Sequence, residues 1–231
     1  MISHESIAFF LPTRRNSERV ANKNTRNFAG IEGGLLRVKL DQLLSVPEIP
    51  IYLSTNDPES IAIAGGYDNP RIKIIERPEK LCLSTTNLQD LIDYVPSIIE
   101  ESHIMWVHVT SPMVDSNDYQ IAISHYFENL SSGSFDSLMS VVKLQEYFWS
   151  KELNNLINHD RSKIKWPRTQ DLNALYEINH AIFLSSKENY LTFHDRIGEF
   201  PFLFEMNKMK SIDIDWEDDF KLAEFIYENV R

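Results

Sequence analysis

Short apolar runs alternate with amphipathic stretches over residues 1–142. The first apolar run is continuous and ends at Pro12, as expected for a buried parallel strand. The strands predicted in this part of the chain are 7–11, 49–54, 71–76, 104–109 and 136–142. The helices predicted between them are 34–44, 58–65, 87–101 with a kink at Pro96, and 115–129. Repeated strand–helix–strand units favour an α/β fold with a mostly parallel sheet, helices on both faces and right-handed crossovers.

The pattern breaks between residues 143 and 175, where the chain is polar, carries Trp149 and Trp166, and shows no clean period. We interpret this stretch as an arm that leaves the main domain and could serve dimerisation. Regularity then returns with predicted strands at 178–184, 202–205 and 212–215. An amphipathic helix is predicted to close the chain at 216–229, and its expected inward residues are Phe220, Ala223, Phe225, Ile226 and Val230.

Composition narrows the class of protein. The 231 residues include 34 acidic and 23 basic side chains, a formal charge of −11, and 42% are apolar. This is enough apolar content for a full core. The negative charge argues against a general binder of nucleic acid or anionic membranes, because both require a basic face. Only 7 glycines occur, fewer than is usual for an enzyme that holds phosphates on a glycine-rich loop.

Cysteine usage and hydropathy point to a cytoplasmic protein. The single cysteine, Cys82, allows no internal disulfide and no cysteine-cluster metal site, and its apolar neighbours favour a small buried side chain. No segment approaches the roughly 18 apolar residues of a membrane span. The apolar run near the N-terminus is short, and its basic residues follow it, which is the reverse of a secretory signal.

Polar segments that follow the predicted strands are the candidate ligand-binding positions, because ligands of such sheets bind beyond the carboxyl ends of the strands. The segment 13–26 follows the first strand and holds five basic residues and one acid, Glu18. Arg14, Arg19 and Lys23 could converge on phosphates, with backbone amides as further donors. The alternative is a solvated surface loop that pairs with part of the acidic excess.

A second candidate lies at 211–215. Strand alternation would put Asp213 and Asp215 on one face, where two carboxylates can share a magnesium ion that also binds phosphate oxygens. The alternative is a polar outer face on an edge strand. After the third strand, Arg77 and the segment 84–87 could contact a base or a phosphate, or form a loop that ends in a helix cap. No Walker loop, dinucleotide fingerprint, paired metal-binding histidines or nucleophile elbow occurs.

Taken in order, these segments resemble the acylneuraminate cytidylyltransferase family, which includes the CMP-sialic acid, CMP-Kdo and CMP-pseudaminic acid synthetases. The likeness covers nearly the whole chain. The segments that carry it are Arg14–Asn24, Ile51–Asp57, Arg77–Leu81, Thr110–Pro112, Pro167–Leu172, Asn179–Phe183 and Ile212–Asp215. The Arg-Pro-x-x-Leu, Thr-Ser-Pro and Ile-Asp-x-Asp patterns are among the family's motifs.

The resemblance implies a three-layer, Rossmann-like nucleotide-diphospho-sugar transferase fold over a single domain, 1–231, with 143–175 as the dimerisation and substrate arm. It implies a homodimer that binds CTP, Mg²⁺ and a 2-keto-3-deoxy sugar acid, transfers CMP to the acid and releases pyrophosphate for surface polysaccharide synthesis. The residues implied to bind the nucleotide are Arg14, Ser17, Lys23, Asn24, Arg77 and Thr86. Those implied to bind the sugar are His108, Arg168, Gln170 and Asn179. Asp213 and Asp215 are implied to bind the metal, and Arg14, Lys23 and Asp215 to act in catalysis.

Several positions depart from the family pattern. Glycine is usual around Arg15 and Asn16 and at His180, and glutamine at His108. Glu18 stands where a basic residue is common. Two further hypotheses therefore stay open: a family member that has lost catalysis and acts as a binding or assembly protein, and a nucleotidyltransferase that uses another base or sugar.

Overall fold

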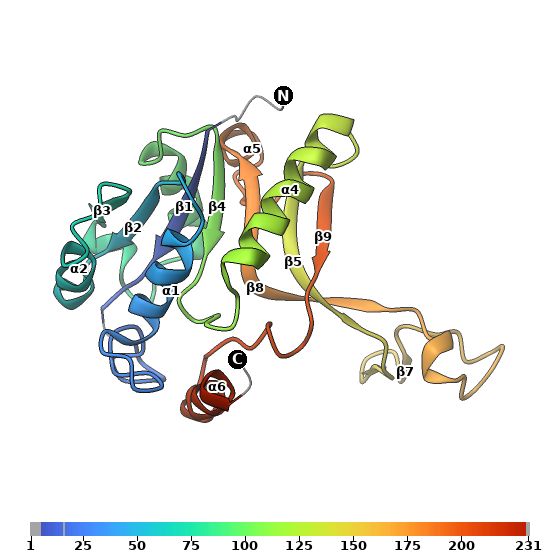
Figure 1. Ribbon diagram of the computed structural model, residues 1–231. Helices are drawn as coiled ribbons and strands as arrows, with labels where there is room; N and C mark the ends of the chain where they lie inside the picture. Colours follow the sequence, from blue (N-terminus) through green and yellow to red (C-terminus); the bar gives the residue numbers. More distant parts are fainter. Residues whose placement is uncertain (1–5, 16, 230–231) are drawn as a thin grey trace.

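A seven-stranded sheet forms the centre of the molecule, as seen in a computed structural model that describes residues 6–15 and 17–229 (Figure 1). The strand order is β3-β2-β1-β4-β8-β5-β9. The strands are β1 (Ile7–Pro12), β2 (Ile51–Thr55), β3 (Ile72–Glu76), β4 (His103–Val107), β5 (Ser137–Leu144), β8 (Leu175–Ser186) and β9 (Pro201–Glu205). All seven coincide with strands predicted from the apolar runs, with shifts of a few residues at the ends.

The sheet is mostly parallel, as predicted, but β8 is antiparallel to both of its neighbours. The pairs β1–β2, β1–β4, β2–β3 and β5–β9 are parallel, whereas β4–β8 and β5–β8 are antiparallel. The reason is the connection that precedes β8. The chain leaves the domain along β5 and returns along β8, so the two strands pair as a long antiparallel ribbon rather than through a crossover helix.

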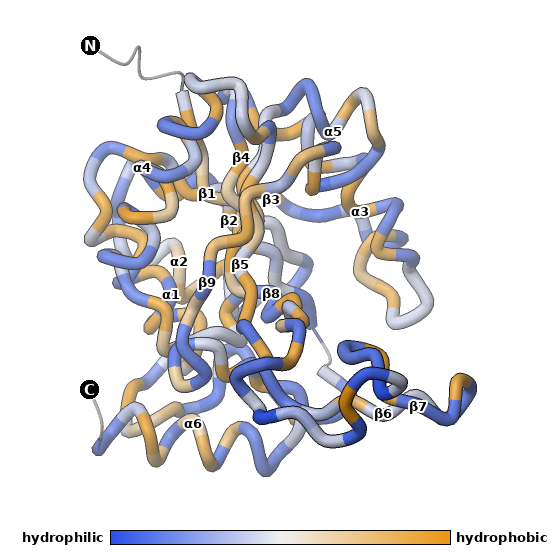
Figure 2. The backbone as a smooth tube through the Cα atoms, turned by 90° about the vertical axis from the view of Figure 1, so that its right-hand side faces the viewer, coloured by the Kyte–Doolittle hydropathy of each residue, from blue (hydrophilic) through white to orange (hydrophobic). Residues whose placement is uncertain are grey.

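Helices cover both faces of the sheet and complete three layers. They are α1 (Gly34–Leu44), α2 (Pro58–Gly65), α3 (Leu88–Tyr94), α4 (Ser116–Ser132), α5 (Lys187–Phe193) and α6 (Glu217–Asn229). Strand β1 shows how the core divides, because Phe9 and Leu11 pack with α1 and α4 on one face, while Ala8 and Phe10 pack with α3 and α5 on the other. In Figure 2 the sheet strands are predominantly hydrophobic, whereas α6 alternates between hydrophobic and hydrophilic positions.

The sequence prediction and the structure differ at three elements. The helix expected at 87–101 ends at Tyr94 and continues only as a 3₁₀ turn, Val95–Ser97, because Pro96 cannot donate a helical hydrogen bond. Helix α5 was not predicted. The segment 212–215 alternates like a strand but forms none, because it pairs with no strand of the described structure, and its backbone-to-backbone contact with the domain is the hydrogen bond from Ile214 N to Thr110 O at 3.0 Å.

Helix α6 begins in an acidic first turn, which complements the positive end of the helix dipole. Phe220 and Ala223 are buried against the core, as predicted, but the prediction for Phe225 is wrong, because its side chain is 61% exposed. Ile226 is half-buried, and Val230 lies outside the described residues. The Asp219 carboxylate accepts hydrogen bonds from the backbone N–H groups that precede the helix, at 3.1 Å and 2.7 Å. This cap ties the helix start to the segment 213–216.

The predicted irregular stretch forms an arm that extends away from the domain beyond β5 and β8 (Figure 1). It contains a two-residue hairpin pair, β6 (Trp149–Ser150) with β7 (Asn155–Leu156), and a 3₁₀ turn, Thr169–Asp171. The Tyr147 hydroxyl donates to Pro167 O, and its ring meets Trp166 edge-on at 5.7 Å. Few of the arm's side chains are buried, so its conformation depends on such local contacts.

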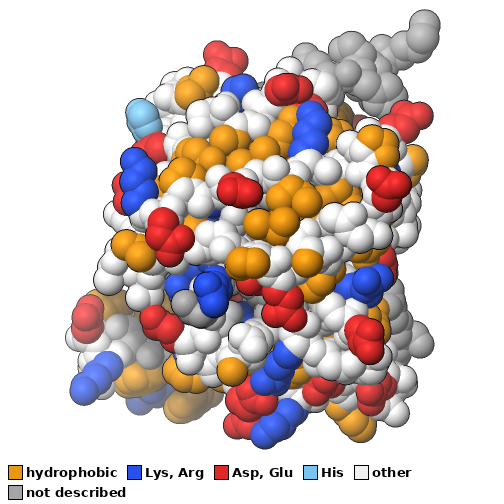
Figure 3. All heavy atoms as spheres, turned by 90° about the vertical axis from the view of Figure 1, so that its left-hand side faces the viewer, with side chains coloured by type: hydrophobic (Ala, Val, Ile, Leu, Met, Phe, Trp, Pro, Cys, Tyr) orange, Lys and Arg blue, Asp and Glu red, His pale blue; other side chains and the backbone are white. Residues whose placement is uncertain are grey.

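Charged side chains of both signs are interspersed on the side of the molecule near α2 and β3, where Figure 3 shows Lys and Arg among Asp and Glu. The basic charge of the segment 14–26 therefore does not extend over this side of the molecule. Within the described part of the chain, no helix combines the length and the apolar character needed to cross a membrane.

Candidate functional site

The carboxyl ends of β1, β2, β3 and β4 meet at one edge of the sheet, and the polar segments that follow them contact one another. Arg77, after β3, donates to the carbonyl of Thr13, after β1. The backbone N–H of Arg15 donates to Asn56 Oδ1, after β2, at 3.0 Å. Parallel strands with short crossovers bring these segments together, as predicted from the order of the elements.

A cavity of about 400 Å³, which we call the central cavity, opens at this edge. Its lining comes from the end of β1, from the basic loop between Arg14 and Asn24, from the segment after β3, from α3 and from the end of β4. The residues are Pro12, Thr13, Arg14, Ser17, Glu18, Arg19, Val20, Lys23, Asn24, Arg77, Ser84, Leu88, Leu91, Trp106, His108, Val109 and Thr110. The predicted site residues that it brings together are Arg14, Ser17, Lys23, Asn24, Arg77 and His108. Arg19 and Glu18 also line it. Four cations around one opening suit a polyanionic ligand.

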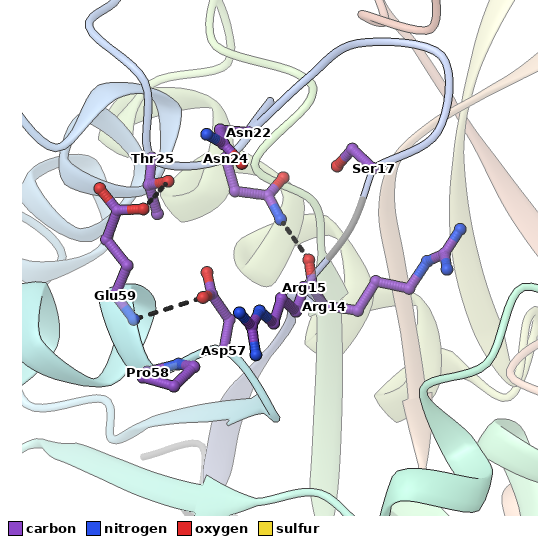
Figure 4. A pocket seen from close by; sticks show the side chains of 9 residues that line it. All are labelled: Arg14, Arg15, Ser17, Asn22, Asn24, Thr25, Asp57, Pro58 and Glu59. Carbon is purple, nitrogen blue, oxygen red and sulfur yellow. Dashed lines mark hydrogen bonds between the residues drawn. The ribbon is translucent and has the colours of Figure 1, made fainter.

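A second opening of about 290 Å³, the outer cavity, lies on the other side of the basic loop (Figure 4). Asp57 and Glu59, from the start of α2, form part of its wall. Figure 4 shows Arg14 directed away from these two carboxylates. The Asn24 amide, which is 8% exposed, donates to Arg14 O at 3.2 Å and so fixes the loop between the two cavities. The departure at Asn16 lies outside the described residues.

Lys23 joins the basic loop to the segment with the two aspartates. Its Nζ donates to Ile214 O at 2.6 Å and lies 3.9 Å from Asp215 Oδ1. Burial lowers the pKa of Lys23, and the charges of Asp215 and Asp213 oppose that shift. Two predicted functional segments that are 190 residues apart in the chain are therefore adjacent in the fold, which supports reading them as one site.

Arg77 is buried beneath the central cavity. Its Nε donates to Cys82 Sγ at 3.2 Å, and Cys82 is 5% exposed, as its apolar context predicted. Thr86 is less central than expected. Its hydroxyl donates to Lys80 O at 2.8 Å, which stabilises the turn before α3, and its side chain does not line the central cavity.

The two aspartates lie together in a third opening of about 440 Å³, the carboxylate cavity, with Asn179 and His180. Burial raises the pKa of Asp213, and the nearby charge of Asp215 adds to the shift. Asp213 Oδ1 is buried without a hydrogen-bond partner in the described structure. A buried carboxylate oxygen in that position fits a hard cation, since Mg²⁺ takes one or two protein carboxylates and completes its shell with phosphate oxygens and water.

His108 is held by both ring nitrogens. Trp106 Nε1 donates to His108 Nε2 at 3.0 Å, and His108 Nδ1 lies 2.6 Å from His180 O. The second contact requires the proton on Nδ1. Burial and the Arg196 charge lower the pKa of His108 to about 3. The side chain therefore stays neutral, and it presents its ring to the central cavity rather than a free nitrogen.

Asn179 positions the backbone beside the aspartates. Its amide donates to Ser211 Oγ at 2.9 Å, and its Oδ1 accepts from Ser140 Oγ at 2.5 Å and from Ala181 N at 3.2 Å. These bonds span an irregularity in the β5–β8 pairing between Met139 and Val141. Asn179 thus links the sheet to the segment that leads to Asp213.

His180 occupies a backbone conformation that favours glycine, with φ 58°. A non-glycine residue costs about 1–2 kcal/mol there. We expect His180→Gly to raise the free energy of unfolding by about 1 kcal/mol, measured by urea denaturation. His180→Ala keeps the Cβ atom and so should leave the free energy of unfolding nearly unchanged. Equal effects of the two substitutions would show that the backbone conformation is not the cause.

Two predicted sugar-binding residues lie elsewhere. Arg168 and Gln170 are on the arm, exposed, and outside the central and carboxylate cavities of this chain. Arg168 pairs with Asp171 at 2.8 Å and 3.0 Å, and Gln170 O accepts from Gln145 at 2.9 Å. Within one chain, Arg168 and Gln170 therefore lie apart from the predicted nucleotide-binding residues that line the central cavity.

One important residue was missed by the sequence analysis. Lys39 in α1 is fully buried, and its Nζ donates to Ser111 O at 2.9 Å, Val114 O at 3.2 Å and Tyr119 Oη at 2.7 Å. The segment it holds contains the predicted Thr-Ser-Pro turn after β4. The helical spacing does indicate that this lysine is buried, because Lys39 lies one helical turn from Leu35 and Leu43 on the apolar face of α1.

The cytidylyltransferase family profile matches residues 8–230. An N-acylneuraminate cytidylyltransferase of Streptococcus agalactiae serotype III is 25% identical over 226 residues, or 91% of this chain and 50% of that protein. One of Escherichia coli is 26% identical over 229 residues, or 94% of this chain and 51% of that protein. The chain spans about half the length of the curated relatives it matches.

Solved structures show the same fold. A CMP:2-keto-3-deoxy-manno-octonic acid synthetase complexed with CTP has a TM-score of 0.67 and 12% identity, with 98% of this chain and 100% of that chain covered. A 4-diphosphocytidyl-2C-methyl-D-erythritol synthase from Anaerococcus prevotii has a TM-score of 0.69 and 10% identity, with 99% and 98% covered. These neighbours confirm the predicted α/β architecture.

Proposed function

Because the chain belongs to the cytidylyltransferase family, we propose that it transfers CMP from CTP to a 2-keto-3-deoxy sugar acid of the sialic-acid or Kdo kind. The product, a CMP-sugar, would serve surface polysaccharide synthesis. The observation that carries the proposal is the junction at Lys23, where the cationic loop after β1 meets the aspartate pair. The names of the curated relatives and of the solved synthetase that holds CTP support the choice of substrates.

In the proposed reaction the anomeric hydroxyl of the sugar acid attacks the α-phosphate in line, and pyrophosphate leaves. Arg14 and Lys23 bind the triphosphate and neutralise charge that develops on the leaving group. Asn24 and Arg77 fix the loop and the strand ends that receive the nucleoside, so that the reacting groups are held in line. Asp213 and Asp215 would hold Mg²⁺, which would lower the pKa of the attacking hydroxyl and neutralise phosphate charge when bound.

The test is pyrophosphate release on incubation with CTP, Mg²⁺ and a panel of nonulosonic and octulosonic acids. We expect release with at least one acid, and replacement of CTP by UTP, ATP or GTP should reduce it strongly. Absence of release with every acid would contradict the proposal. Binding of CTP in calorimetry without turnover would then favour the hypothesis of a non-catalytic binding protein, and preference for another nucleotide would favour a different base.

We further propose that the protein acts as a homodimer joined through the arm. Apolar side chains stand exposed there, and the largest exposed fractions are those of Leu153 (69%), Trp166 (66%), Ile164 (57%), Trp149 (51%) and Ile157 (50%). Burial of such a patch against a second copy would stabilise the dimer. Such a dimer would also allow Arg168 and Gln170 of one chain to contact the sugar acid bound to the other chain.

The dimer proposal predicts that Trp166→Asp yields monomers in sedimentation velocity at concentrations where the unmodified protein is dimeric. Leu191→Asp is the matched control, because Leu191 is 60% exposed but lies in α5, at the opposite end of the sheet from the arm (Figure 1). A monomeric unmodified protein, or dissociation by both substitutions, would contradict an interface on the arm.

A further inference from the structure

Arg19 belongs to the basic loop, but its side chain contacts Asp215 and Trp216, in and next to the segment that holds the two aspartates. We propose that Arg19 is a positioning residue that holds Asp215 before the metal binds and passes to the triphosphate when metal and nucleotide bind together. This inference rests on the proposed function, because it assumes that Asp213 and Asp215 form the metal site.

The geometry places Arg19 between two openings. Its Nη2 lies 2.8 Å from Asp215 Oδ1, and its guanidinium lies over the Trp216 ring, 5.1 Å from the ring centre. Arg19 lines the central cavity, whereas Asp215 and Trp216 line the carboxylate cavity. One side chain therefore touches both the region proposed for the triphosphate and the aspartate pair.

The Arg19–Asp215 pair can exchange partners because it is open to water. The two side chains are 49% and 45% exposed, and ion pairs that are this exposed contribute little to stability. Lys23, in contrast, is 15% exposed and is fixed by its short hydrogen bond to Ile214 O. Of the two cations beside Asp215, Lys23 is suited to a fixed role and Arg19 to a mobile one.

Charge balance gives the direction of the exchange. Without a metal, Arg19 offsets part of the repulsion between Asp213 and Asp215. A divalent cation on these carboxylates would repel the guanidinium and compete with it for Asp215. A triphosphate in the central cavity would then accept the released guanidinium, as arginine binds phosphate well. Arg19 thus opposes metal binding alone and favours binding of metal and nucleotide together, which is a coupling between two sites.

The test compares two ligands whose affinities should change in opposite directions. Mn²⁺ serves as the metal probe, and its free concentration is followed by electron paramagnetic resonance in the absence of nucleotide. In Arg19→Gln we expect Mn²⁺ to bind about threefold more tightly, the change expected when an exposed ion pair no longer competes for Asp215. The same substitution should weaken binding of CTP in the presence of Mg²⁺ by about tenfold, measured by calorimetry. A residue with a merely structural role would weaken both ligands or neither.

Arg26→Gln is the matched control. It removes the same charge from the same basic segment, 13–26, but Arg26 pairs with Glu217 at 2.8 Å and lies over Phe220, so neither affinity should change by more than about twofold. If Mn²⁺ binding in Arg19→Gln is unchanged or weaker, or CTP binding is unchanged or tighter, the inference is overturned. If Asp213→Asn in the otherwise unmodified protein leaves Mn²⁺ binding intact, the proposed metal site itself fails, and the inference with it.

Discussion

Replacing Asp213 by asparagine is expected to lower the rate of metal-dependent pyrophosphate release by about 10²–10³-fold, since one preorganised electrostatic contact contributes on this order. The substitution keeps the shape of the side chain and removes its charge. Asp213 Oδ1 is buried and has no hydrogen-bond partner in the described structure, so the loss falls on an oxygen that a cation would otherwise satisfy. Asp215→Ala should likewise abolish most metal-dependent turnover while the protein stays folded.

The measurement is initial rate against Mg²⁺ concentration at saturating CTP and sugar acid, with circular dichroism as the check on folding. Asp218→Asn is the matched control, because Asp218 belongs to the same acidic segment but its side chain is 97% exposed. Its rate should equal that of the unmodified protein. Equal losses in Asp213→Asn and Asp218→Asn would mean that general negative charge, not a specific carboxylate, supports the reaction.

Replacing Lys39 by alanine is expected to lower the free energy of unfolding by about 3–5 kcal/mol, because the loss of a large buried side chain and of the donor to several buried acceptors act together. The Lys39 side chain is fully buried in α1, and its ammonium satisfies three acceptors on the segment after β4 and the start of α4. Alanine leaves these acceptors without their donor and opens a cavity. Urea denaturation followed by tryptophan fluorescence measures the change.

Two further variants separate the effect of the lost hydrogen-bond donor from the effect of the cavity. Lys39→Met retains most of the volume but no donor, so its loss in unfolding free energy should be smaller than that of alanine and still above about 1 kcal/mol. Lys221→Ala is the surface control, at 67% exposure, with an expected change within about 0.5 kcal/mol. A change below about 1 kcal/mol in Lys39→Ala would show that the buried lysine is not a structural support.

The Lys39 network also bears on the site. Lys39 holds the carbonyl of Ser111, the neighbouring Thr110 carbonyl accepts from Ile214 N at 3.0 Å, and Ile214 lies between the two aspartates. The aspartate segment has no strand partner, so this contact and the Lys23 bond to Ile214 O are its backbone supports from the domain. Its position therefore depends on side chains that are distant in sequence.

Particular elements show why some predictions from sequence were right and others wrong. The run 7–11 is apolar at every position, which suffices for a strand buried on both faces. The alternation at 212–215 predicts that the two aspartates lie together, and both line the carboxylate cavity. The strand that it also predicts is wrong, because a strand needs a partner and local pattern cannot supply one.

The same contrast applies to the candidate site. The residues after each strand were predicted to meet, and Arg14, Ser17, Lys23, Asn24, Arg77 and His108 do line one cavity. The engagement of both His108 nitrogens could not be predicted, since the partners are Trp106 and the backbone of His180, 72 residues away. Arg168 and Gln170 lie on the arm, and the sequence contains no signal for the direction in which an irregular segment projects.

Local sequence pattern accounts for the alternation of strands and helices, the basic loop after the first strand and the pair of aspartates near the end, because each depends on neighbours within a few residues. Tertiary packing, in contrast, sets the antiparallel direction of β8, the three acceptors of the Lys39 ammonium and the ion pair between Arg19 and Asp215. The physical reason is common to all three. Each arises where segments far apart in the chain pack together, and burial and charge pairing at such contacts are properties of the assembled fold.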